Sequence, residues 1–101
     1  MTKENQKITF NEIVASMEKT LLSKAEDYAN EDRLSNFKVT AAITGTKPEL
    51  IGLTMIAVKV ARLGVLLNSS KKPNNESIQD SVLDLANYAV LLSMILKETE
   101  L

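Results

Sequence analysis

The 101-residue chain contains no cysteine and no histidine. Without cysteine it has neither disulfide bonds nor thiolate metal ligands, which is compatible with a reducing compartment. Without histidine it has no zinc site of the usual kind and no Ser-His-Asp, Cys-His or imidazole acid-base catalysis. Any catalysis would therefore depend on carboxylates, lysine, tyrosine or a hard metal ion.

Residues that interrupt helices are also scarce. The chain has three glycines and two prolines, whereas 45% of its residues are hydrophobic, and leucine, alanine, isoleucine, valine, lysine and glutamate are common. This composition favours helices over sheets. A chain of this length suits one domain. We therefore expect a single all-α domain that spans residues 1–101.

The charge is nearly balanced, with a formal net charge of −1. A dedicated DNA or RNA binder would need a basic face, so we expect no such activity. The first seven residues are polar and lack the apolar run of a secretory signal, which favours a cytoplasmic location. Residues 50–67 are apolar enough to resemble a membrane span, but Lys59 and Arg62 lie in their middle. Charges at that depth are costly in lipid, so a buried helix of a soluble protein is expected.

Two capping motifs predict where helices begin. The sequence TFNE at 9–12 is a capping box followed by an apolar stripe at helical spacing, which predicts a helix to about Ala29 or Asn30. The sequence TKPE at 46–49 is a second capping box with an early proline, which predicts a long helix to about Leu67. Residues 30–36 are expected to form a connection. An apolar stretch at 37–43, ended by Gly45, favours a short helix.

A turn-like segment at 68–74 separates the long helix from a last one, which is expected to start at Asn74 or Asn75 and end near Lys97. So short a connection predicts a long antiparallel C-terminal helix hairpin. Both of its helices carry apolar residues on more than one side, which a small four-helix monomer cannot cover. We therefore expect a helical bundle that forms a homo-oligomer, either a dimer or a higher assembly.

Acidic residues recur at every fourth position near the start of the last helix. Glu76, Asp80 and Asp84 share a stripe that Asn87 extends, because residues three and four apart lie on one helical face. The stripe interrupts an apolar segment. These carboxylates are therefore expected at the edge of a core, where they need a partner.

Two basic residues of the preceding helix, Lys59 and Arg62, lie about as far before the turn as the acids lie after it. They are expected to meet Asp80 and Asp84 across the hairpin. One interpretation is that these charges neutralise one another and set the helix register. The other is that the basic pair grips phosphate oxygens, while Glu76 and the two aspartates hold magnesium or the cationic side of a ligand.

A second polar group surrounds the end of the first predicted helix. Aromatic rings there can stack on a base, and amide side chains can bind polar base edges. A plain helix end with a cap is the alternative interpretation. The candidate ligand-binding residues of this group are Lys24, Asp27, Tyr28, Asn30, Asn36 and Phe37.

Four segments together resemble one known family: DYAN at 27–30, NF at 36–37, KVARL at 59–63 and the stretch 75–89. They are similar to the small phage and bacterial nucleotide modification associated domain 1 family, a relative of the MazG-like all-α nucleotide pyrophosphatases. The resemblance covers the chain from about Lys24 to Val90. It implies an all-helical, MazG-like oligomer that handles nucleotides in a helix-bundle pocket.

The resemblance also implies site residues. MazG-like enzymes bind magnesium with an acidic pair on each of two adjacent helices and hydrolyse nucleoside triphosphates to monophosphates. Asp80 and Asp84 match the later pair and are thereby candidate catalytic residues. The earlier pair is not matched, because Lys59 and Arg62 stand in its place and bind phosphate rather than a cation.

Three hypotheses follow. In the first, which the basic pair favours, the protein binds a phosphorylated nucleotide without cleaving it, as a sponge for a nucleotide signal in phage counter-defence or as a reader of a modified nucleotide. In the second, a reduced Mg²⁺ site with Asp80, Asp84 and either Glu76 or Asp27 hydrolyses a phosphoanhydride. In the third, the chain is a structural helical oligomer without a ligand.

Overall fold

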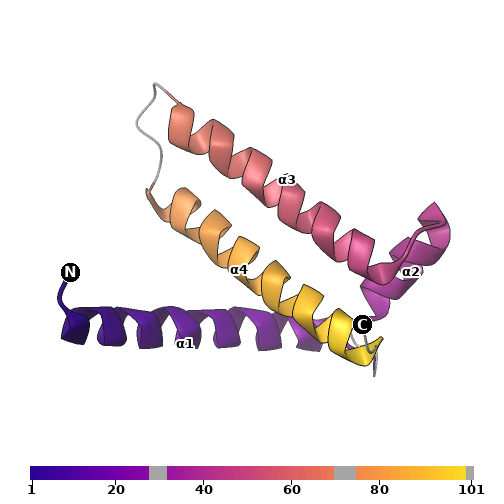
Figure 1. Ribbon diagram of the computed structural model, residues 1–101, viewed down its shortest axis with the longest axis horizontal. Coiled ribbons are helices and arrows are strands. Elements are labelled where there is room, and N and C mark those ends of the chain that lie inside the picture. The colour runs from indigo at the N-terminus through magenta and orange to yellow at the C-terminus, as the bar shows by residue number, and fades with distance from the viewer. Residues whose placement is uncertain (28–31, 70–74, 100–101) are drawn as a thin grey trace.

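The part of the chain that the computed structural model describes, residues 1–27, 32–69 and 75–99, is helical and contains no strand (Figure 1). The prediction of an all-α protein is confirmed. The four helices of this part are α1 (Lys3–Asp27), α2 (Ser35–Thr44), α3 (Pro48–Asn68) and α4 (Asn75–Glu98).

Helix α1 begins at Lys3, so the helix start predicted from the capping box at Thr9 is wrong. Thr2 caps the helix instead, because its Oγ1 accepts a hydrogen bond of 3.1 Å from the Asn5 amide. Residues 3–7 are lysine, glutamate, asparagine, glutamine and lysine, several of which are good helix formers, and neither glycine nor proline precedes Thr9. The helix therefore extends past the motif to Thr2, whose hydroxyl caps it.

Helix α2 ends at Gly45, as the sequence predicts. Gly45 has a φ of 69°, in the left-handed region that favours glycine. The Thr46 amide then donates a hydrogen bond of 2.9 Å to the Ala41 carbonyl, which closes the end of the helix. The short helix predicted at 37–43 is confirmed and begins two residues earlier, at Ser35.

Helix α3 begins at Pro48, and the residue at its N-cap is Lys47. Lys47 is extended, with φ −112° and ψ 149°, because the residue before a proline avoids the helical conformation. The early position of proline is confirmed. The capping role predicted for Thr46 is wrong, since Thr46 lies one residue outside the cap and its hydroxyl contacts the Thr44 hydroxyl at 3.0 Å.

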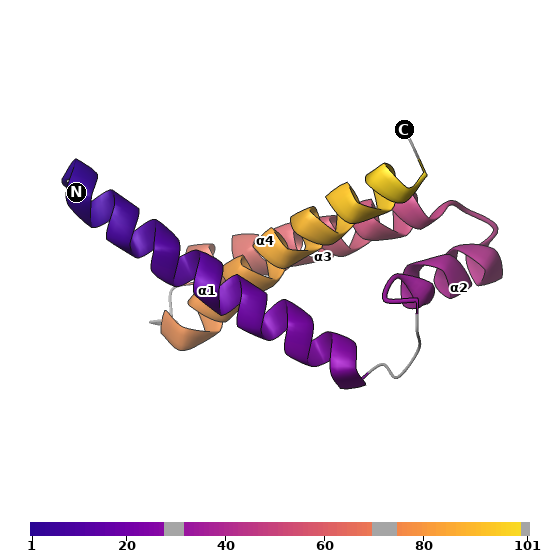
Figure 2. The same cartoon turned by 90° about the horizontal axis from the view of Figure 1, so that it is seen from below.

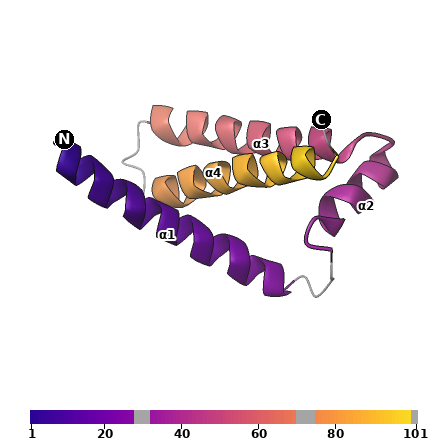
Figure 3. The same cartoon turned by 60° about the horizontal axis from the view of Figure 1, so that its bottom comes forward.

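Helices α3 and α4 lie side by side and run in opposite directions (Figures 1 and 3). The two helices approach each other closely at Gly52, which is buried. A Cβ atom at this position would lie 3.3 Å from Cδ1 of Leu92 and 3.6 Å from Cδ1 of Ile95. The absence of a side chain at Gly52 therefore lets the two helices approach closely at the α2 end of the pair.

The other two helices cover little of this pair. Helix α1 packs against α4, and its N-terminal end extends beyond the rest of the chain (Figure 2). Helix α2 packs against α3 and lies far from the N-terminal end of α1 (Figure 2). Among the described residues, only four apolar ones are buried: Leu34, Ala41, Leu63 and Ile95.

Helix α3 is long and apolar enough to cross a membrane by length and composition, and it alone passes that test in the described part of the chain. We expected it to be a buried helix. Within one chain that expectation is wrong, since only 11% of its most apolar stretch is buried. The reason is that α4 covers one side of the helix, while the apolar residues surround it.

We predict that Gly52→Leu lowers the free energy of unfolding by about 1–3 kcal/mol, because overpacking forces α3 and α4 apart. The measurement is chemical denaturation followed by circular dichroism. Gly52→Ala is the matched control and should change stability much less, since the nearest atom to its Cβ is the end of the flexible Leu92 side chain and alanine favours a helix. Equal stability of the leucine variant and the wild type would contradict the close approach.

Candidate functional site

The centre of the predicted polar group is an ion pair between α3 and α4. Nζ of Lys59 lies 3.1 Å from Oδ2 of Asp84, and 20% and 27% of the two side chains are exposed. The antiparallel arrangement brings these residues level, as their distances from the turn predict. The predicted contact between Lys59 and Asp84 is confirmed, and both charges are partly withdrawn from water.

Arg62 and Asp80 were also expected to take part in this ionic layer, and for these two residues the prediction is wrong. Both residues are exposed, and neither forms an ion pair with any residue of the described chain. Arg62 follows Lys59 by three residues, so its side chain is rotated by about 60° around the axis of α3 from the direction of Lys59. Arg62 is therefore turned away from the line on which Lys59 meets α4. Asp80 likewise lies on a solvated face rather than at the edge of the core.

Two uncharged polar residues of α4 are buried on either side of Asp84. Ser81 is 5% exposed and Asn87 is 6% exposed. Neither amide atom of the Asn87 side chain has a hydrogen-bond partner. A buried amide without hydrogen-bond partners costs free energy. Of the predicted ligand-binding residues whose side chains the structure describes, Asn87 alone has polar atoms that are buried and unsatisfied.

The predicted magnesium site stays a prediction, because the structure describes only part of it. No group of three or more acidic side chains gathers in the part of the chain that the structure describes. One oxygen of Asp84 faces the Lys59 ammonium, and a second positive charge at that oxygen would be repelled. The side chain of Glu76, the third predicted ligand, lies outside the described residues. We therefore derive no step through a metal ion.

The second predicted group is described only in part. The side chains of Lys24 and Asp27, and the whole of Tyr28 and Asn30, lie outside the described residues. Asn36 and Phe37 lie in the first turn of α2 and not in a connection, which corrects the boundary predicted at 30–36. Asn36 is exposed and Phe37 is half-buried.

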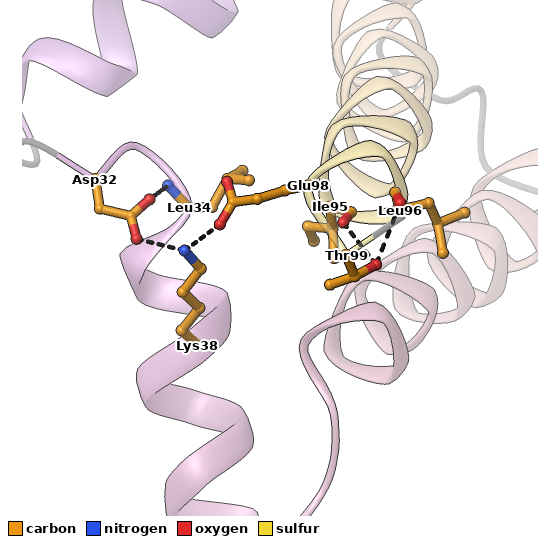
Figure 4. A network of polar contacts seen from close by, with 7 residues as sticks. All are labelled: Asp32, Leu34, Lys38, Ile95, Leu96, Glu98 and Thr99. Atoms are coloured by element: carbon orange, nitrogen blue, oxygen red, sulfur yellow. Dashed lines mark hydrogen bonds and ion pairs between the residues drawn. The ribbon is translucent and has the colours of Figure 1, made fainter. Parts of the chain in front are cut away.

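Beside Asn36 and Phe37 lies a polar network that the sequence did not predict (Figure 4). Nζ of Lys38 donates to Oδ2 of Asp32 at 2.6 Å and also to a carboxylate oxygen of Glu98. The other oxygen of Asp32 accepts a hydrogen bond of 3.0 Å from the Leu34 amide. The network joins the start of α2 to the end of α4. No sequence pattern indicates it, because Lys38 and Glu98 are 60 residues apart.

The hydrogen bonds of this network shift two pKa values. The hydrogen bond from Lys38, with help from the Leu34 amide, holds the pKa of Asp32 below its ordinary value of 3.8. The carboxylate of Asp32, followed by that of Glu98, raises the pKa of Lys38 above its ordinary value of 10.5. All three side chains are substantially exposed, so water weakens these interactions.

Within one chain the structure keeps Asn36 and Phe37, the described residues of the second predicted group, apart from Lys59 and Asp84. Glu98, which contacts α2 through Lys38, lies 14 residues after Asp84 on α4. That interval corresponds to about 20 Å along a helix. Asn36 and Phe37 therefore do not share a site with Lys59 and Asp84. A concave surface at the start of α1, lined by Lys3, Glu4, Gln6, Lys7 and Phe10, includes none of the predicted site residues.

No protein-family model, curated protein or solved structure matches the chain. The side chains of the site are therefore the basis on which a function can be assigned.

We predict that Lys59→Met and Asp84→Leu each lower the free energy of unfolding by about 1–3 kcal/mol, because each leaves a half-buried charge without its partner. The double variant should be more stable than the sum of the two effects predicts. Urea denaturation of the four proteins measures this coupling. Additive effects would show that the ion pair contributes nothing.

We predict that Lys38→Met increases amide hydrogen exchange in α2, since the network joins that helix to α4. The stabilising effect of Asp32 is present above pH 3.8 and is lost as the pH falls through its lowered pKa. That of Lys38 is present below pH 10.5 and is lost as the pH rises through its raised pKa. Amide hydrogen exchange in α2 should therefore differ between Lys38→Met and the wild type from pH 3.8 to pH 10.5.

Exchange measured by mass spectrometry at several pH values checks this prediction. Lys97→Met, an exposed lysine in the last turn of α4, is the matched control. A difference between wild type and Lys38→Met that persists well below pH 3.8 would contradict the assigned role of Asp32.

Proposed function

We propose that the chain binds a phosphorylated nucleotide at the Lys59–Asp84 layer and does not cleave it. The observation that supports this most directly is the arrangement of the two basic residues on α3. Lys59 is held in place by Asp84 at 3.1 Å, and Arg62, one turn further along, is exposed and has no ion partner in the described chain. An arginine without a partner beside a positioned lysine is suited to phosphate oxygens.

Each side chain has a distinct role in this proposal. The Arg62 guanidinium binds a phosphate with two parallel hydrogen bonds, because its planar fork matches phosphate geometry. The Lys59 ammonium supplies a second positive charge. Asp84 fixes that ammonium, and the solvated carboxylate of Asp80 accepts hydrogen bonds from ribose hydroxyls or from a base. The base and sugar remain unassigned.

Magnesium-dependent hydrolysis is the second candidate function. Asp80 and Asp84 are one turn apart on α4, which is the spacing of an acidic pair in the MazG-like pattern. The Lys59 ammonium beside Asp84 opposes a divalent cation at that carboxylate, so binding without cleavage is favoured. A structural helical oligomer, in which the ion pair only sets register, is the third candidate.

The resemblance to the nucleotide modification associated domain 1 family supports a biological role for nucleotide binding. A small cytoplasmic protein of phage type that binds a nucleotide without turnover would act by sequestering a nucleotide signal or a modified nucleotide. The net charge of −1 agrees with a small-molecule ligand rather than with DNA or RNA.

We predict that Arg62→Ala weakens nucleotide binding by about 10- to 100-fold, which corresponds to the loss of hydrogen bonds to a charged group. Thermal-shift screening of nucleoside mono-, di- and triphosphates and cyclic dinucleotides, with and without Mg²⁺, identifies the ligand. Isothermal titration calorimetry then gives the dissociation constants. Lys97→Ala removes the same charge from an exposed site on α4 and should leave binding unchanged.

Chromatography of the recovered ligand separates the candidate functions. An intact nucleotide supports the proposal, whereas a monophosphate produced only with Mg²⁺ supports hydrolysis. If no nucleotide raises the melting temperature, the structural candidate remains and the binding proposal is wrong.

A further inference from the structure

The side of α3 that faces away from α4 is mostly apolar. We name it the outer α3 face and define it by six large hydrophobic residues that are 47–72% exposed: Leu50, Leu53, Val58, Val60, Val65 and Leu67. Ala57, Ala61 and Gly64 lie between them and are also exposed. Lys59 points to α4, and the other charged residues of α3 lie at the borders of this face, Glu49 in the first turn and Arg62 near the middle of the helix. Such a surface is unusual on a chain that stays alone in water.

The polar side chains Thr54 and Asn68 on the outer α3 face already donate hydrogen bonds within the chain. Oγ1 of Thr54 donates a hydrogen bond of 2.8 Å to the Leu50 carbonyl, and Nδ2 of Asn68 donates one of 2.7 Å to the Gly64 carbonyl. Both groups bond to the backbone of their own helix. Covering them with an apolar surface would therefore cost little, because few hydrogen bonds to water would be lost without replacement.

The whole chain exposes far more surface than a monomer of its size. Its accessible area is 7717 Å², whereas a monomeric protein of 11.1 kDa exposes about 5,700 Å². The radius of gyration is 15.6 Å, against about 13 Å for a globular domain of 100 residues. The excess of about 2,000 Å² per chain matches what one protomer buries in a large obligate interface.

A second exposed apolar strip lies on α1. Phe10, Ile13 and Val14 are 63%, 49% and 39% exposed, and they lie in the N-terminal half of α1. These residues share one face of the helix with Met17, which is half-buried. Each chain thus carries an extended apolar helix and an uncovered apolar face, which are the two parts that a pair of identical chains needs for mutual cover.

We propose that a second copy of this chain packs on the outer α3 face and forms an obligate homo-oligomer of at least two chains. A lipid bilayer is a less suitable occupant, because the exposed Arg62 borders the middle of this face and a charge there is costly in hydrocarbon. Arginine at the border of a protein interface is common. The inference does not depend on nucleotide binding, since none of the six defining residues belongs to the proposed nucleotide site.

We predict that the wild type has a mass of at least twice 11.1 kDa by size-exclusion chromatography with light scattering at micromolar concentration. Leu53→Glu and Val60→Glu place a charge in the proposed interface and should reduce that mass to one chain. Val39→Glu is the matched control, because Val39 of α2 is 57% exposed and Val60 is 53% exposed. The control should keep the mass of the wild type.

Helical circular dichroism distinguishes dissociation from misfolding. If a glutamate variant unfolds, intermolecular crosslinking of a Leu53→Cys variant under oxidising conditions is the second measurement, and a disulfide-linked dimer supports the proposal. A monomeric wild type, or Val60→Glu variants that stay folded and keep the wild-type mass, would overturn it. A monomer that co-sediments with phosphatidylcholine and phosphatidylglycerol vesicles would overturn it in favour of a lipid surface.

Discussion

The apolar surface that surrounds α3 is the constraint on which the rest of the structure depends. The outer side of this helix is mostly apolar, and α4 covers only one side of the helix. The opposite side contains Leu53 and Val60, each about half exposed. Since burial of apolar surface is the main stabilising contribution in folding, the small number of buried apolar residues in the described part of the chain supports the proposed cover by a second copy. The extended position of α1 supports it as well.

Within this apolar environment the Lys59–Asp84 ion pair is the main polar link between the long helices. Its partly buried position makes each charge dependent on the other, because a lone charge would lose hydration without compensation. The ion pair also affects which charge a ligand beside Asp84 can carry. An ammonium beside Asp84 disfavours a divalent cation there and places positive charge next to Arg62, which favours an anionic ligand. Nucleotide binding and structural register are both consistent with this arrangement, whereas metal-dependent hydrolysis requires Lys59 to move away.

Much of the fold followed from local patterns. The helix starting at Pro48 and the helix end at Gly45 were predictable because a proline and a left-handed glycine act on their own backbone. The Lys59–Asp84 contact was predictable because a short connection makes level residues face each other. The start of α1 was not, since a capping box inside a run of good helix formers does not stop a helix. The direction of Arg62 was not either, because it depends on the rotation of α3 about its axis.

The sequence by itself determined the all-α class, the approximate bounds of α2, α3 and α4 and the pairing of Lys59 with Asp84, because helix signals and antiparallel register act through neighbouring residues. Only the tertiary structure decided which faces stay uncovered, how far Asn36 lies from Asp84, and that Lys38 joins α2 to Glu98. These features depend on crossing angles and on contacts between residues distant in the chain. Such contacts arise from the balance of all packed surfaces, which no local pattern specifies.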